Sequence, residues 1–290
     1  MNEPLALRRV LRYIDRHLDE PLDLETLSEV AELSPHHFQR SFAAALGLTA
    51  ARYVRLLRLR RAAYRLAFRP GARILDLALD AGYSSHEAFT RAFARVCGRT
   101  PAAFRAAPTW EAWHTAARLL RPLRARHMPS EPQATDVRIV DFPRTPVALL
   151  THRGDPAGIE ATIARFVAFR RAHGLPPSAS ATFNVCYGSP DDADPAEFRI
   201  DLCAATTQPV PENPQGVVAS ELPAARCAVL RHVGSDATLG QSFAYLYGSW
   251  IPARGEAPHP GAQPFLQRIA WFPDVPEHEA IVDVFAPLAS

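Results

Sequence analysis

The chain has 290 residues, about twice the usual size of a single domain, and 48% of them are hydrophobic and 21% charged, as in globular proteins. Charges interrupt every apolar run near Met1, and no later stretch approaches 18 apolar residues, so secretion and membrane spanning are both disfavoured. The net charge of +2 joins a basic segment, residues 1–107 (17 Arg, 11 Asp and Glu), to an acidic one, residues 134–290 (11 Arg, 17 Asp and Glu). This asymmetry favours nucleic acid as the partner of the first segment.

The four cysteines lie far apart in the sequence and form no C-x-x-C pair. A zinc knuckle and a redox motif are therefore unsupported, and no metal or cofactor is expected. Reduced thiols in a cytoplasmic protein are the simplest interpretation.

The first hundred residues have helical periodicity. Ser34 and Pro35 are placed to begin one helix, and Gly47 to end it. A shift of 51 positions superimposes this stretch on a second one. The matching pairs are Ser34 and Ser85, Phe38 and Phe89, Arg40 and Arg91, Phe42 and Phe93, and Tyr53 and Phe104. So many matches without a gap indicate a duplication.

Each repeat predicts a helix-turn-helix whose second helix carries arginine, which favours binding of duplex DNA in the major groove. The phenylalanines of each second helix must face the core, so the residues between them face outward. The expected DNA-contacting residues are His36, His37, Gln39, Arg40, His86, Glu87, Thr90 and Arg91. His36 and His37 have no third ligand nearby in sequence, so a metal site there is not expected.

These residues give the segment its resemblance to the DNA-binding domain of the AraC family of transcription regulators. The second unit, from Ala81-Gly82-Tyr83-Ser84-Ser85-His86 to Phe104-Arg105, matches the family signature closely, and the resemblance covers residues 5–106. It implies an all-α domain with two reading heads, promoter duplex DNA as a partner, and RNA polymerase as a further protein contact. The family's base-reading positions fall on His36, Arg40, His86, Glu87 and Arg91, although some members carry Trp where this chain has His36.

Residues 108–133, rich in Pro and Arg, predict a linker with a helix that docks on either domain. Residues 134–290 then alternate short strands with helices. Here a shift of 80 superimposes residues 148–154 on residues 228–234, which predicts an α+β domain of two pseudo-repeats with an antiparallel sheet. Each repeat carries a His-x-Gly turn, at His152 and His232, and a repeated turn explains these histidines better than catalysis because no nucleophile accompanies them.

Residues 136–288 resemble the gyrase-inhibitor-like effector-binding domain, which binds small molecules in several drug-responsive regulators. The resemblance rests on residues 185–192, which include an acidic turn at Pro190-Asp191-Asp192, and on residues 198–201, 228–234 and 264–266. It implies a small-molecule effector. The expected ligand-binding residues are Tyr187, Tyr245, Trp250, Leu266, Arg268 and Trp271.

One departure from that family bears on the ligand. Leu266 stands where members usually carry a Glu that faces organic cations, and Arg268 stands where they carry Tyr. We therefore expect an effector other than a lipophilic cation, unless the register is shifted by one residue and Arg268 faces solvent.

The predicted protein is thus a one-component transcription regulator and not an enzyme. Two alternatives stay open for the second domain. It could be a hydrolase of reactive small molecules, with Glu277, Glu279 or Asp283 substituting for the missing Glu, or a protein-binding module.

Overall fold

The computed structural model describes residues 3–69, 71–118, 120–128, 132–188 and 194–289. It divides into two compact units, Met1–Pro129 with Pro276–His278, and Ser130–Val275 with Glu279–Ser290. The acidic turn expected at Pro190-Asp191-Asp192 lies outside the described residues. Within the described ranges, no helix is both long and apolar enough to cross a bilayer.

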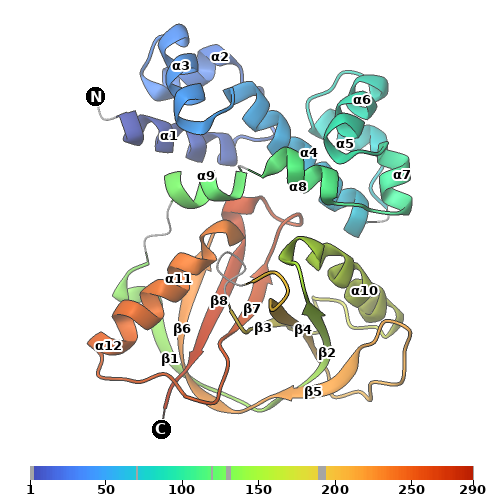
Figure 1. Cartoon of the computed structure of the whole chain (residues 1–290), viewed down its shortest axis with the longest axis vertical. Helices are drawn as coiled ribbons and strands as arrows, with labels where there is room; N and C mark the ends of the chain where they lie inside the picture. Colours follow the sequence, from blue (N-terminus) through green and yellow to red (C-terminus); the bar gives the residue numbers. More distant parts are fainter. Residues whose placement is uncertain (1–2, 70, 119, 129–131, 189–193, 290) are drawn as a thin grey trace. The chain divides into compact units, whose positions relative to one another are not determined.

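The first unit is helical (Figure 1). Its helices are α1 (Glu3–Arg16), α2 (Leu24–Ala31), α3 (Pro35–Leu46), α4 (Ala50–Phe68), α5 (Ile74–Asp80), α6 (His86–Cys97), α7 (Pro101–Ala106), α8 (Glu111–Ala117) and α9 (Leu120–His127). The pairs α2–α3 and α5–α6 are the two helix-turn-helix units, and α4 connects them.

The second helices of the two helix-turn-helix units, α3 and α6, begin and end in the same way, as the repeat in the sequence predicts. The hydroxyl of Ser34 accepts a hydrogen bond from the backbone N–H of His37, and that of Ser85 accepts one from Ala88. Gly47 and Gly98 end the helices with φ of 70° and 74°, the left-handed conformation that glycine adopts without strain. These local signals explain why both helices could be predicted from sequence.

Phenylalanines form the core of each helix-turn-helix unit. Phe38 packs on Phe42 and Phe89 on Phe93, with ring centroids 5.5 and 5.6 Å apart, and all four are buried. The expectation that these rings belong to the core is therefore confirmed. Truncation of such a ring typically costs about 3–5 kcal/mol.

The turn of the second helix-turn-helix unit, between α5 and α6, depends on a glycine. Gly82 has φ of +80°, and a Cβ on it would lie 2.6 Å from Nη1 of Arg58, whose guanidinium donates to the carbonyls of Leu18 and Glu20. Gly82→Ala is therefore expected to destabilise the chain by about 1–2 kcal/mol, measured by denaturant unfolding. Gly71→Ala is the control, because a Cβ added there would meet no atom within 4 Å. Equal stability of the two variants would contradict this account.

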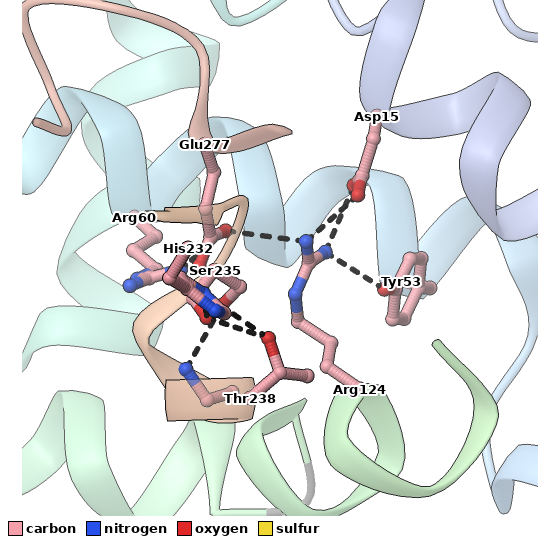
Figure 2. A network of polar contacts seen from close by, with 9 residues as sticks. Asp15, Tyr53, Arg60, Arg124, His232, Ser235, Thr238 and Glu277 are labelled. Atoms are coloured by element: carbon pink, nitrogen blue, oxygen red, sulfur yellow. Dashed lines mark hydrogen bonds and ion pairs between the residues drawn. The ribbon is translucent and has the colours of Figure 1, made fainter. Parts of the chain in front are cut away.

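Residues 111–117 and 120–127, expected to lie in a linker, form α8 and α9 of the first unit, where α8 contacts α6 and α9 contacts α1. Trp110 and Trp113 are buried, and the Trp110 ring lies 5.1 Å from that of Phe104. On α9, the buried Arg124 donates to both carboxylate oxygens of Asp15, at 2.8 and 2.7 Å, and to Tyr53 Oη at 3.3 Å (Figure 2). This polar contact fixes α9 on the helix-turn-helix region.

The second unit is α+β, with one eight-stranded antiparallel sheet (Figure 1). Its elements are β1 (Val137–Phe142), β2 (Thr145–Arg153), α10 (Ile159–Ala172), β3 (Thr182–Cys186), β4 (Arg199–Ala205), β5 (Val218–Leu222), β6 (Ala225–Val233), α11 (Leu239–Tyr245), α12 (Ile251–Ala253), β7 (Phe265–Ala270) and β8 (Ile281–Pro287). The strand order is β1-β6-β8-β7-β3-β4-β2-β5.

The sheet consists of two equivalent halves, β1-β6-β8-β7 and β3-β4-β2-β5, which meet between β7 and β3. The second sequence repeat places β1 on β5 and β2 on β6, so the duplication seen in the sequence is also present in the sheet. However, the first strand of each sequence repeat lies in the half of the sheet formed by the other repeat, because β1 pairs with β6 and β5 pairs with β2. The halves are therefore joined by exchanged edge strands as well as by the central β3–β7 pair.

The sheet has two distinct faces. Phe166 and Phe169 of α10 pack on one face beside Leu150 and Leu202, and Leu246 and Trp250, which follow α11, pack on the same face beside Val282. We call the opposite face the open face. Its core cluster of described residues comes entirely from strands: Phe142, Val147, Phe183, Val185, Cys203, Leu222, Cys227, Val229, Phe265 and Phe285.

Candidate functional site

Helix α3 presents the expected DNA-contacting residues to solvent. His36, His37, Gln39 and Arg40 are all exposed, whereas Phe38 between them is buried. Across the described part of the chain, Arg40 has no ion-pair partner, so its guanidinium is free to contact a phosphate or a base edge.

Helix α6 repeats this arrangement with one difference. His86, Glu87 and Arg91 are exposed, and Arg91 also lacks an ion-pair partner within the described ranges. Thr90 differs from the expectation: it is half-buried, and its hydroxyl oxygen is enclosed without a hydrogen-bond partner among the described residues. The reason is its position next to Phe89, at the edge of the inward stripe of the helix.

The six expected ligand-binding residues do not share one face of the second unit. Tyr187, which follows β3, is exposed, and its hydroxyl donates to Asp201 on the open face. Trp250 is buried among the helix-side residues, and Tyr245 packs against the same cluster. Trp271, which follows β7, is half-buried.

Leu266 and Arg268 lie on the helix side of the sheet, the side on which Trp250 and Tyr245 also pack. Side chains alternate along β7, and Phe265 faces the open side, so Leu266 and Arg268 point toward the helices. Leu266 is buried there, and Arg268 donates to Asn184 Oδ1 at 2.7 Å and lies 3.0 Å from Asp236. The side chain that β7 presents between them on the open face is that of Gln267.

Two buried aspartates on the open face are absent from the ligand-binding residues expected from sequence. The first, Asp201 on β4, is 1% exposed. It accepts hydrogen bonds from Thr151 at 2.7 Å, Tyr187 at 2.8 Å and Arg199 at 2.8 Å. The Arg199 guanidinium also stacks on the Tyr187 ring, 3.9 Å from its centroid. Although burial opposes ionisation, these hydrogen bonds hold the pKa of Asp201 below its usual value.

The second, Asp283 on β8, is 2% exposed and is bound by two arginines. Arg231 donates through Nε at 2.8 Å and Nη2 at 3.0 Å, and Arg138 donates through Nη2 at 2.7 Å. Burial again opposes ionisation, but the two guanidinium groups keep the pKa of Asp283 below its usual value. The signal that could have found both residues is a lone Asp inside each of two apolar strands.

The comparisons with known proteins agree with this two-part structure. A family model described as a GyrI-like small molecule binding domain matches residues 135–289, more than half of the chain. The chain belongs to the GyrI-like family. A helix-turn-helix domain model matches residues 27–107, and this part is an AraC-type DNA-binding domain, so the resemblances seen in the sequence are confirmed.

Two proteins of Escherichia coli K12 are similar to stretches of this chain. The chain is 36% identical over 156 residues to the probable transcriptional regulator YgiV of Escherichia coli K12, which covers 53% of this chain and 96% of that protein. It is 37% identical over 115 residues to the right origin-binding protein of the same organism, which covers 39% of each chain. A solved hydrolase from Listeria innocua is 12% identical with a TM-score of 0.42, over 55% of this chain and 94% of its own, which carries no argument about activity.

The two repeated histidines of the GyrI-like domain, His152 and His232, form hydrogen bonds within the turns that follow β2 and β6. In the first half, Nδ1 of His152 lies 2.8 Å from Thr162 Oγ1 and Nε2 lies 3.2 Å from the carbonyl of Asp155. In the second half, Nδ1 of His232 lies 2.9 Å from Ser242 Oγ. Its Nε2 lies 3.1 Å from the carbonyl of Ser235 (Figure 2). Both ring nitrogens of each histidine are engaged, so the geometry supports a structural role.

Burial lowers the pKa of His232 below 6.5, because the protonated ring is poorly solvated there. The unfolded chain therefore binds a proton on this ring more readily than the folded chain does. The free energy of unfolding keeps its full value above about pH 6.5 and falls as the pH drops toward the pKa of the folded state, by at most about 1.4 kcal/mol per pH unit. We expect His232→Gln to reduce this slope, measured as the melting temperature between pH 7.5 and 5.5. The exposed His259→Gln is the control, and an unchanged slope in the His232 variant would overturn the assignment.

Proposed function

We propose that the chain binds promoter DNA through α3 and α6, and that a small molecule bound by the GyrI-like domain changes the strength of this binding. The chain is a DNA-binding transcription regulator with a GyrI-like small-molecule-binding domain. The observation that carries the finer proposal is the pair of equivalent recognition helices, each with an exposed arginine, on one chain with an effector-type domain.

The spacing of the two recognition helices supports simultaneous reading. Helix α4, with 19 residues, connects the two units and spans about 28 Å at about 1.5 Å per residue. Successive major grooves on one side of B-DNA are about 34 Å apart. We therefore propose a single asymmetric DNA site. Residues His36, His37, Gln39 and Arg40 of α3 and His86, Glu87 and Arg91 of α6 contact it. Thr90 packs at the edge of the buried face of α6 and does not contact the bases.

We also propose an effector other than a lipophilic cation, on different grounds from Leu266 and Arg268. The open face carries Arg138 and Arg231 around a single carboxylate, and Arg199 beside another. Positive charge on that face disfavours a cationic ligand. As a DNA-bound regulator the protein would work in the cytoplasm, and RNA polymerase is the proposed further protein partner.

The hydrolase alternative has less support. Asp283 is bound by two arginines, which makes it a weak general base. Burial raises the pKa of the Cys186 thiol to about 12 and that of Cys227 to about 11, and it also raises that of Cys203, so none of the three thiols of this domain is a ready nucleophile. We propose that the chain is not an enzyme, and steady hydrolysis of p-nitrophenyl acetate above the buffer rate would contradict this.

The test of the proposed function uses the full chain. Duplexes that it binds are selected from a random pool, and the affinity for the best one is measured by fluorescence anisotropy with and without each member of a small-molecule panel. We expect at least one compound to change the dissociation constant about fivefold or more. Compounds that raise the melting temperature but never change DNA affinity would refute the sensor role, and a panel without binders would favour a protein-binding domain.

A further inference from the structure

Two arginines share one buried carboxylate on the open face. Arg138 comes from β1 and Arg231 from β6, and both donate to Asp283 on β8. Arg138 is opposite Val229 in the β1–β6 ladder and Arg231 is opposite Asp283 in the β6–β8 ladder, so all three side chains lie on the open face. Together, the side chains of Arg138, Arg231 and Asp283 carry a net charge of +1.

The two guanidinium groups retain unused donors. Each arginine side chain is 47% exposed, whereas Asp283 is almost completely enclosed. Nη1 of Arg231 and both Nε and Nη1 of Arg138 make no hydrogen bond to any described residue. A guanidinium that keeps free donors beside a neutralised carboxylate is suited to bind a second anion.

The other half of the domain provides an internal comparison. At the equivalent aspartate, Asp201, a single arginine balances the charge, and the hydroxyls of Thr151 and Tyr187 supply the remaining donors. The second sequence repeat places Thr151 on Arg231 and Val218 on Arg138. Among the described residues, the direct binding of two arginines to one aspartate is therefore found at Asp283 and not at Asp201, and neutralising the aspartate would require only one of them.

Apolar side chains lie beside the two arginines. Val233 and Ile281 pair with each other one step further along the same strands, on the same face as Arg231 and Asp283. Val233 is 58% exposed, so apolar surface is accessible beside the two guanidinium groups. A ligand with an anionic head and an apolar body would satisfy both features.

We propose that Arg138 and Arg231 bind the carboxylate or another anionic head of an amphipathic small molecule, whose apolar part covers Val233 and Ile281. The inference rests on the proposed function, because it names the ligand class of the GyrI-like domain. It adds the residues that recognise the ligand and the sign of its charge.

The test compares three probes with the same tail and different heads: octanoate, octan-1-ol and octylammonium. Binding to the full chain is measured by isothermal titration calorimetry, below the concentrations at which these compounds form micelles. We expect octanoate to bind at least tenfold more tightly than octan-1-ol, and octylammonium to bind least. Tighter binding of octylammonium would overturn the proposal.

Single substitutions locate the site without leaving Asp283 unpaired, because the other arginine remains. Arg138→Gln and Arg231→Gln are each expected to weaken octanoate binding about tenfold or more, with little effect on octan-1-ol. Arg138→Lys should restore part of the affinity, since it keeps the charge but loses the planar donor group. Arg144→Gln is the control, because Arg144 is exposed in the same unit and pairs with Glu221.

The result separates this inference from the proposed function. Octanoate that binds through Arg138 and Arg231 but leaves DNA affinity unchanged would confirm the site and refute the sensor role. A different compound that changes DNA affinity in the wild type and equally in both Gln variants would support the sensor role and overturn the site. Normal melting of the variants confirms that either reading concerns binding, not folding.

Discussion

Arg124→Ala is expected to destabilise the chain by about 3–5 kcal/mol, because it leaves the Asp15 carboxylate buried without its partner. The side chains of Arg124 and Asp15 are only 4% and 5% exposed, and the pair has two short hydrogen bonds. Burial also raises the pKa of the adjacent Tyr53 to about 12, so its hydroxyl stays neutral and adds no second negative charge beside Asp15. Denaturant unfolding of the full chain measures the loss.

Two further variants make this prediction specific. Arg126→Ala, an exposed position on the same helix α9, is expected to change stability by less than about 0.5 kcal/mol. The double variant Asp15→Leu/Arg124→Met should recover most of the stability, because it removes the unpaired Asp15 carboxylate, and Glu277, which lies 3.7 Å from Arg124, keeps its ion pair with Arg60. If Arg124→Ala were as stable as Arg126→Ala, α9 would not be fixed by this ion pair.

The second large effect concerns DNA. Arg40→Ala and Arg91→Ala are each expected to weaken binding to the selected duplex by about 1–3 kcal/mol, or about 5- to 150-fold. The two arginines lie on separate helix-turn-helix units, so the losses should add in the double variant. Anisotropy titration with specific and unrelated duplexes measures both affinity and discrimination.

Arg153→Ala is the matched control, since it removes the same charge from an exposed position of the second unit. An equal loss of affinity for specific and unrelated duplexes would assign Arg40 and Arg91 to phosphate contacts. Unchanged binding in the double variant would exclude α3 and α6 from the DNA interface.

The helix-turn-helix units could be predicted from sequence because their signals are local. Ser34 and Ser85 cap their helices through residues three positions ahead, and the phenylalanines recur at helical spacing. The residues exposed on α3 follow directly from this periodicity. Thr90 is the exception, because a position at the edge of the buried stripe depends on how closely neighbouring side chains pack.

The orientation of the residues expected to bind a ligand was harder to predict, because the face of a strand residue depends on its register. A shift of one residue exchanges the faces, and this is why Leu266 and Arg268 point toward the helices and Gln267 does not. The donors to Asp283 come from strands 52 and 145 residues away in sequence. Similarly, Asp15 and Arg124 are separated by 109 residues, so no local pattern indicated their contact.

The exchange of β1 and β5 has a consequence for how this domain is made. When β1 leaves the ribosome, the chain has yet to be extended through β2, β3, β4 and β5 before its partner β6 is made, and β6 in turn awaits β8. Neither half can complete its sheet from its own sequence, so the edge pairs β1–β6 and β2–β5 form late, whereas β2, β4 and β3 can pair earlier. Such non-local pairing slows folding, and the unfinished edges are exposed until synthesis ends. Helices α1 to α9 precede this whole domain in the sequence, so they can form during translation while the edges of its sheet are still unpaired.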